Sequence, residues 1–327
     1  MFDLIKDIMK PLGVSGREGP VRDVIKEKIA PYVDEITIDA LGNLIAHKKG
    51  APGAKKLMFA AHMDEIGFFT TCIDDGGRIR YSNAGGIRFA ETVYSHVVFE
   101  NGVRGVLVAD DDAKEFNIKN GFVDIGAKNK KEAERRVSVG DTFAVRGDIR
   151  RIGGGRIAGR PFDDRIGCAI LVEMARRMKT PCPYDVYFVF TVQEEVGCRG
   201  SKTAAYAIMP DIAVAVDITK TGDTPGSLKM AVELGGGAAI KVKDNSAISS
   251  PELVDKMIKL CRERKIKYQL EVLTMGGTDA SSMQSAGAGC MVGCISIPTR
   301  YAHTPVEVID MNDVSACVEL GLALIEE

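Results

Sequence analysis

The sequence predicts an α/β fold in which a sheet buried on both faces carries a small, inserted β-rich domain. Three observations lead to this prediction. After about residue 159, short apolar strands alternate with helices, a pattern typical of a sheet covered by helices on both sides. Between about residues 70 and 158, the apolar runs are short and β-like, with Gly, Asn and Asp between them. A chain of 327 residues also corresponds to about two domains.

The first 70 residues predict helices, a hairpin and a strand. Segment 1–30 is expected to form two short helices, because the Gly- and Pro-rich sequence PLGVSGREGP interrupts it. EITIDALGNLIAHKK contains two apolar runs on either side of Leu41-Gly42-Asn43, which indicates a hairpin. A short, fully apolar strand follows at 57–61.

Strands and helices alternate in the last 170 residues. The expected elements are a helix at 164–178, a strand at 184–192, a helix starting near 200, a strand at 212–216, a helix at 251–264, a strand at 290–297 and a final helix in NDVSACVELGLALIEE. The prediction therefore divides the chain into a discontinuous larger domain, residues 1–69 and 159–327, and an inserted domain, residues 70–158.

Composition argues against several classes of protein. Lys and Arg total 43 and Asp and Glu total 45, so there is no basic excess of the kind that drives binding to nucleic acid. No apolar stretch reaches the length of about 18 residues that a membrane span needs. The N-terminus lacks the basic start and continuous apolar run of a signal peptide, so we expect a cytoplasmic location. The eight cysteines form no C-x-x-C pair, which favours buried thiols in a reducing compartment.

Side chains of the types that bind metals gather at the ends of the predicted strands. They are His62 and Asp64 after strand 57–61, Glu194 and Glu195 after strand 184–192, Asp217 after strand 212–216, His303 six residues beyond strand 290–297, and Asp163 at the start of helix 164–178. In open α/β sheets, ligands bind at the carboxyl ends of the strands. If the strands are neighbours, these side chains converge.

Each of these residues also has an ordinary structural explanation. His62 by itself could be a core histidine, Asp163 a helix cap and Asp217 a turn residue. The spacing of His62 and Asp64 favours a functional role, because alternate residues of an extended segment share a face. Asp64 can therefore orient the imidazole of His62, as a carboxylate commonly does for a histidine that binds a metal.

The charges of the carboxylates also favour a metal site. Asp163, Glu195 and Asp217 would raise one another's pKa if they were packed together without cations. Two divalent cations would supply four positive charges against these three negative charges, and a bridging hydroxide would balance the remainder. This combination is typical of a hydrolytic two-metal site. Imidazole and carboxylate ligands suit zinc, cobalt or manganese.

Five motifs, AAHMDEIGF, GRPFDDRIG, TVQEEVGCRGS, AVAVDIT and YAHTPVEVI, together resemble the tetrahedral (TET) family of dinuclear metallo-aminopeptidases, which includes glutamyl, leucyl, lysyl and deblocking aminopeptidases. The resemblance spans residues 10–320. It implies a catalytic domain with a mixed sheet in a three-layer αβα arrangement of the phosphorylase/hydrolase-like type. It also implies that the inserted, barrel-like domain forms dimers, and that these dimers build a homododecamer.

The resemblance also implies roles for the residues of the site. His62 and Asp217 would bind one metal ion, Glu195 and His303 would bind the other, and Asp163 would bridge the two ions. A cis peptide bond is expected at the bridging aspartate, between Asp163 and the next residue.

Two further residues receive roles from the same resemblance. Glu194 is expected to be the general base, and Asp64 the partner of His62.

The Gly-rich segment 276–281 is expected to lie near the substrate, although a plain turn would have the same composition. His47 and His96 have no carboxylate at ligand spacing and are expected to be structural.

The expected activity is hydrolysis of the N-terminal residue of short peptides by a bridging hydroxide with Glu194 as base. Two alternatives use the same residues differently. One is an endoglucanase-type glycosidase, since glycosidases use paired carboxylates, although such an enzyme needs no histidine cluster. The other is an aminoacylase or deblocking deacylase on the same scaffold.

Overall fold

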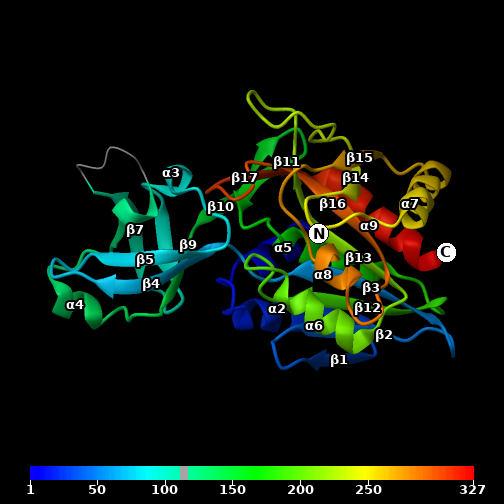
Figure 1. Cartoon of the computed structure of the whole chain (residues 1–327), viewed down its shortest axis with the longest axis horizontal. Helices are drawn as coiled ribbons and strands as arrows, with labels where there is room; N and C mark the ends of the chain where they lie inside the picture. Colours follow the sequence, from blue (N-terminus) through cyan, green and yellow to red (C-terminus); the bar gives the residue numbers. More distant parts are fainter. Residues whose placement is uncertain (111–116) are drawn as a thin grey trace.

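A computed structural model describes residues 1–110 and 117–327 and shows two parts of unequal size (Figure 1). In the described residues, the larger part contains an eleven-stranded sheet and the smaller part a closed barrel of six strands. The barrel lies at one end of the molecule, away from most of the helices (Figure 1). Mixed sheet, flanking helices and barrel together confirm the predicted fold class.

The strands of the larger sheet follow an order that differs from their order in the chain. From one edge to the other they are β1 (Glu35–Ile38), β2 (Leu44–Lys48), β12 (Tyr184–Thr191), β3 (Lys55–His62), β13 (Ile212–Lys220), β16 (Met291–Arg300), β17 (Glu307–Asp310), β11 (Arg156–Arg160) and β10 (Gly147–Gly153), with β14 (Ala238–Lys243) paired to β16 and β15 (Tyr268–Val272) paired to β14. The hairpin expected around Leu41-Gly42-Asn43 is the antiparallel pair β1–β2.

Four central strands, β12, β3, β13 and β16, run parallel to one another. Their carboxyl ends therefore meet at one edge of the sheet. The register places Thr191, the last residue of β12, opposite His62, the last residue of β3. Polar residues that follow neighbouring strands are brought together at this edge, as the sequence predicts.

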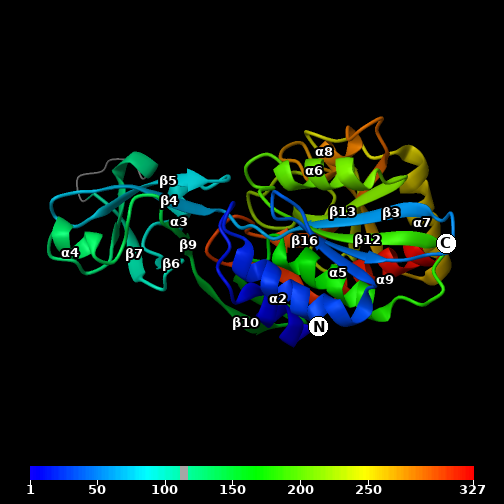
Figure 2. The same ribbon diagram turned by 90° about the horizontal axis from the view of Figure 1, so that it is seen from below.

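Helices cover both faces of this sheet. One face is packed against α1 (Phe2–Met9), α2 (Gly19–Ile29), α5 (Arg165–Arg177), α7 (Pro251–Arg264) and α9 (Met311–Glu326), and the other against α6 (Arg199–Ile208) and α8 (Ala280–Gln284); a short 3-10 helix, η1 (Ala30–Tyr32), follows α2. The layers are visible in Figure 2, where α6 and α8 lie on one side of the sheet and α2 and α5 on the other. Apolar side chains on both faces of the strands explain the continuous hydrophobic runs of the sequence.

Two central strands continue beyond their apolar runs. β13 ends at Lys220 and β16 at Arg300, not at 216 and 297 as expected. The polar residues stay in the ladder because the two strands pair with each other, with Asp217 opposite Ser296. Asp217 therefore lies within a strand and not after its end, so its position is fixed by the sheet.

The smaller part is a closed barrel. Its strands are β4 (Gly67–Ile73), β5 (Ile79–Ala84), β8 (Gly121–Asp124), β7 (Arg104–Ala109), β6 (His96–Phe99) and β9 (Thr142–Val145), in the order of pairing, with α3 (Phe89–Thr92), η2 (Ile118–Asn120) and α4 (Lys130–Glu134) between them. Stacked and edge-on aromatic rings fill its interior, among them Phe68, Tyr81 and Phe143.

The barrel is shorter in sequence than the inserted domain predicted at 70–158. Strands β10 and β11 belong to the larger sheet, because β11 pairs with β17. Short β-like runs look alike in both parts of the chain, so the sequence pattern does not show which sheet they join.

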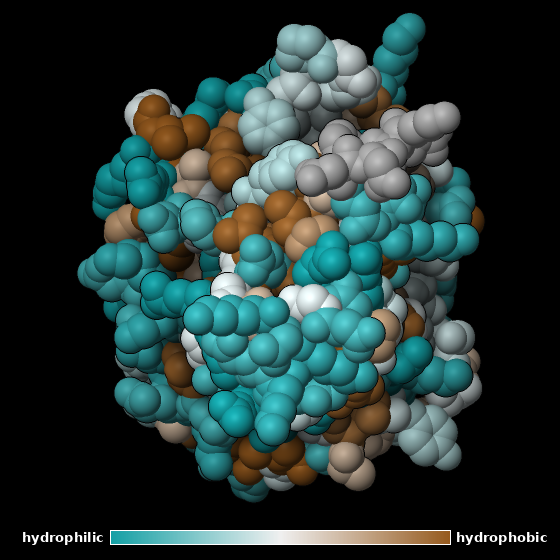
Figure 3. Space-filling model, turned by 90° about the vertical axis from the view of Figure 1, so that its left-hand side faces the viewer, coloured by the Kyte–Doolittle hydropathy of each residue, from teal (hydrophilic) through white to brown (hydrophobic). Residues whose placement is uncertain are grey.

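Hydrophilic side chains predominate on the barrel end of the molecule, and apolar ones form small separate groups there (Figure 3). None of the helices in residues 1–110 and 117–327 combines the length and apolar character that crossing a membrane requires.

Candidate metal centre

Five separate segments deliver the predicted site residues to one edge of the larger sheet. His62 ends β3, Asp217 lies in β13, Glu194 and Glu195 follow β12, Asp163 precedes α5, and His303 follows β16. The first three segments are neighbours in the sheet, since β3 lies between β12 and β13. Residues far apart in the sequence thus meet because the strands run parallel.

The carboxylate of Asp163 lies between two imidazoles. Its Oδ1 is 3.1 Å from Nε2 of His62, and its Oδ2 is 3.0 Å from Nε2 of His303. Asp163 is 6% exposed and His62 is 2% exposed, so this contact lies in a nearly dry part of the protein. Each oxygen of one carboxylate therefore faces the nitrogen of a different imidazole, an arrangement that fits the bridging role expected for Asp163.

One more carboxylate lies beside each imidazole. Oδ1 of Asp217 is 3.8 Å from Nε2 of His62, and Oε2 of Glu195 is 3.5 Å from Nε2 of His303. Ligand atoms of His62, Asp163 and Glu195 lie within 4.8 Å of one another. The structure thus brings together all five residues that were expected to hold metal.

Several of these carboxyl groups are poorly compensated within the protein. Burial raises the pKa of Glu195 to about 8 and that of Asp217 to about 7, with the charge of Asp163 acting in the same direction and the neighbouring imidazoles acting against it. Burial also acts on Asp163, but hydrogen bonds to His303 and His62 hold its pKa below the ordinary value. The Oε1 atom of Glu195 is buried without a hydrogen-bond partner in the described residues. Cations would satisfy these groups, so the residues present fit a divalent metal pair.

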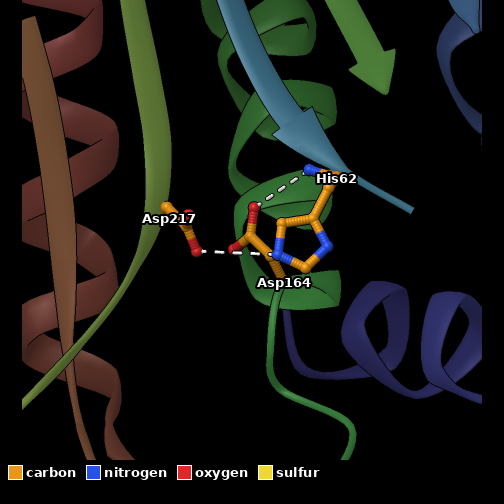
Figure 4. Close-up of side chains that lie close together, drawn as sticks. All are labelled: His62, Asp164 and Asp217. Atoms are coloured by element: carbon orange, nitrogen blue, oxygen red, sulfur yellow. Dashed lines mark hydrogen bonds and ion pairs between the residues drawn. The ribbon is translucent and has the colours of Figure 1, made fainter. Parts of the chain in front are cut away.

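Asp164 lies in the same cluster but has a different use. Figure 4 shows its carboxylate beside His62 and Asp217, and the three residues could together offer ligands. Oδ1 of Asp164 accepts the backbone N–H of Gly167 at 3.1 Å, and Oδ2 accepts that of His62 at 3.2 Å. Asp164 therefore caps α5 and holds the end of β3, which leaves Asp163 as the better ligand. The peptide bond between the two aspartates is cis, as expected from the resemblance.

Asp64 connects the first imidazole with the loop after β12. Its Oδ1 lies 3.4 Å from Nδ1 of His62, which is 3.1 Å from the backbone carbonyl of Asp64. The same carboxylate accepts the backbone N–H groups of Glu194 and Glu195 at 3.0 and 3.2 Å. Ser15 Oγ donates a third hydrogen bond at 2.6 Å. Asp64 is fully buried, so it fixes both a candidate ligand and the loop that carries another candidate ligand, Glu195, and the expected base, Glu194.

Two groups that hold site residues in place were not predicted from the sequence. Glu307, in the YAHTPVEVI motif, accepts the backbone N–H groups of Asp163 and His303 at 3.3 and 3.2 Å. In addition, Nδ1 of His303 lies 2.7 Å from the backbone carbonyl of Gly86, just after the barrel strand β5. The motif contained Glu307, but no pattern in the sequence indicates that a carbonyl from the inserted barrel orients His303.

The centre opens into a cavity of about 710 Å³. The residues that line it include Gly276, Gly277 and Ser281, from the Gly-rich segment that was expected near the substrate. His47 lies elsewhere, in contact with Asp185 at 3.2 Å, and His96 is an exposed residue of barrel strand β6. Neither histidine belongs to the described centre.

Comparisons with known proteins find related sequences and structures. The sequence profile of the M42 glutamyl aminopeptidase family matches residues 42–320. The lysyl aminopeptidase of Pyrococcus furiosus is 34% identical, over 100% of this chain and 97% of that protein.

Two solved structures are similar over their whole length. The Pyrococcus horikoshii TET1 peptidase, described as assembling into a tetrahedron or a large octahedral shell, has a TM-score of 0.88 and 33% identity, covering 100% of this chain and 99% of that chain. A Thermotoga maritima protein described as an endoglucanase has a TM-score of 0.84 and 34% identity, covering 99% of this chain and 96% of that chain.

Replacing Asp64 by Asn should lower turnover about 10–100-fold, the usual cost of losing a group that orients a metal ligand. The amide would place an NH2 donor at a position where both carboxylate oxygens now accept hydrogen bonds. Steady-state kinetics with the thermal melting temperature as a folding control would measure this. Ser15→Ala, which removes one donor and leaves the loop contacts, should cause a smaller loss. A wild-type kcat in the folded Asp64→Asn variant would contradict the importance of these contacts.

Proposed function

We propose, from the premise that the chain belongs to the M42 glutamyl aminopeptidase family and is a metal-dependent aminopeptidase, that its centre holds two divalent ions. As the resemblance implied, one ion would bind His62 and Asp217, the other Glu195 and His303, with Asp163 between them. The observation that carries this proposal is the carboxylate of Asp163, with one oxygen facing each imidazole. Zinc, cobalt and manganese all suit this mixture of nitrogen and oxygen ligands.

Such ions polarise a carbonyl oxygen and lower the pKa of water when bound. The substrates are short peptides with a free N-terminus. The cavity beside the centre gives room for the residue that is released.

Glu194 acts as the general base in this proposal. It follows β12 and its Oε2 lies 3.9 Å from Nε2 of His62, so the carboxylate faces the centre without being among its closest contacts. Burial raises the pKa of Glu194 well above its ordinary value, so this carboxylate takes up a proton more readily than an exposed one does, as a general base must. Glu194 takes a proton from the attacking water and passes it to the leaving amine.

Asp64 acts on the same site through His62. Its buried carboxylate lies on the Nδ1 side of the imidazole, so it favours the tautomer that carries its proton on Nδ1. Nε2 then remains free to bind a cation.

The glycosidase alternative receives no support from the residues of the centre. A two-carboxylate glycosidase needs neither imidazole, whereas both His62 and His303 contact the central carboxylate here. The deacylase alternative uses the same centre and differs only in the substrate. Hydrolysis of aminoacyl-p-nitroanilides, compared with that of N-acyl amino acids and cellulose oligomers, would separate the three activities.

Replacing Glu194 by Gln should lower kcat by about 10²–10⁴-fold, the usual contribution of a general base, while the metal content stays at the wild-type value. The amide has nearly the same shape but does not accept a proton. Aminoacyl-p-nitroanilide turnover and elemental analysis of the same preparation would provide both measurements. Near wild-type turnover would remove Glu194 from the mechanism.

The purified protein should contain two equivalents of divalent metal, and Asp163→Ala should contain fewer, because the bridging ligand is lost. Exhaustive chelation should abolish activity and lower the melting temperature, since a ligand bound only by the folded state stabilises that state. Asp185→Asn, which changes a carboxylate beside His47, is the matched control and should keep two equivalents. Full activity in protein shown by elemental analysis to be metal-free would reject the site.

We also propose that the chain forms a homododecamer from dimers joined through its inserted barrel. The barrel projects from the larger part (Figure 1), which leaves much of its surface free for a second copy. Light scattering should give the mass of twelve 35.2 kDa subunits. A monomer at micromolar concentration would contradict this assembly. The cytoplasmic location expected from the sequence stays a prediction.

A further inference from the structure

The chain folds back on itself directly after the proposed base. The backbone N–H groups of Gly197 and Cys198 both donate to the carbonyl of Glu194, at 2.8 and 2.9 Å. Cys198 has a φ of 50°, in the left-handed region that few non-glycine residues adopt, and it immediately precedes α6. This tight loop returns the side chain of residue 198 to the carboxylate of residue 194.

The thiol of Cys198 lies against that carboxylate. Its Sγ is 3.2 Å from Oε1 of Glu194 and 3.5 Å from the carbonyl oxygen of Thr278. The Ser281 hydroxyl, on the other side, is 2.9 Å from the same Thr278 carbonyl and 3.8 Å from the sulfur. The shorter distance and the negative charge of the carboxylate favour Glu194 as the acceptor of the thiol hydrogen.

The two oxygens of Glu194 therefore have different surroundings. Oε1 faces the thiol, whereas Oε2 faces the imidazole of His62 at 3.9 Å. Within residues 1–110 and 117–327, Cys198 is the one hydrogen-bond donor to this carboxylate. Without it, the end of the side chain would be free to turn.

We propose that Cys198 is a positioning residue for Glu194. Its S–H group holds Oε1, so that Oε2 is directed at the water that attacks the substrate. This inference rests on the proposed role of Glu194 as the general base, and it adds a reason why that base has a defined direction.

A donor at this position must keep its proton. Burial raises the pKa of the Cys198 thiol far above its ordinary value, and the nearby carboxylates of Glu194 and Asp279 raise it further. The thiol thus remains S–H at neutral pH.

A metal ion between Cys198, Glu194 and Asp279 is the competing explanation, since their ligand atoms lie close together. Both oxygens of Asp279 already accept hydroxyl groups, from Ser201 and Thr191, at 2.5 Å each. These bonds satisfy Asp279 without a cation. Together with the protonated thiol, they favour a hydrogen-bonded group over a metal site.

The test compares Cys198→Ala with Cys198→Ser. Neither side chain is branched at Cβ, so both replacements place similar demands on the left-handed backbone, but only serine retains a donor. We expect alanine to lower kcat about tenfold, as loss of a hydrogen bond to a charged group does, with KM within about twofold of wild type. Serine should restore kcat to within about threefold of wild type. Cys290→Ala, at a partly exposed cysteine that does not line the cavity, should behave as wild type.

The melting temperature and the metal content show whether each variant is intact. Three results would overturn the inference. A wild-type kcat for Cys198→Ala would show that the base needs no such support. Equal losses for alanine and serine would indicate packing, and a change in KM alone would indicate contact with substrate. The Glu194→Gln variant separates the two proposals: if it stays active, the role of the base fails, whereas if it is inactive and Cys198→Ala is not impaired, only the positioning role fails.

Discussion

Repulsion between buried carboxylates is the constraint on which the centre depends. Asp163, Glu195 and Asp217 are collected in a space with little water, and burial raises the pKa of the last two. Carboxylates in such a place are stable when cations or hydrogen-bond donors compensate them. The imidazoles of His62 and His303 serve Asp163 in this way within the chain, and a pair of divalent ions would serve the whole group. The surrounding structure mainly fixes these side chains close together.

Other buried carboxylates, which do not face the cavity, hold the segments of the site in place. Asp64 holds the loop of Glu194 and Glu195 by their backbone N–H groups, and Glu307 holds the backbone of Asp163 and His303. Backbone N–H groups are fixed in number and direction, so each buried carboxylate defines the path of two segments at once. The barrel contributes in the same manner through the carbonyl of Gly86.

The fold of this chain does not by itself determine its chemistry. The similar structures include one described as a TET peptidase and one described as an endoglucanase, with nearly the same TM-score. A shared fold does not decide between such activities. The match to the M42 family and the two imidazoles at the central carboxylate favour metal-dependent peptide hydrolysis over hydrolysis of a glycoside. Imidazoles bind the metal ions that peptide hydrolysis needs here.

The sequence by itself determined the α/β class, the order of the central elements and the polar residues at the strand ends, because apolar runs and the polar residues after them are local patterns. The resemblance to the TET family selected the five candidate ligands among those residues. Local patterns also placed Asp163-Asp164 at the start of a helix. Only the tertiary structure decided that β10 and β11 join the larger sheet, that Asp217 lies inside β13, and that Asp164 caps α5 while Asp163 faces both imidazoles. It also revealed Ser15, Glu307 and Gly86 as supports, and the thiol of Cys198 beside Glu194. The physical reason is that these contacts join segments whose approach depends on strand pairing and loop closure, and neither leaves a periodic signal in the chain.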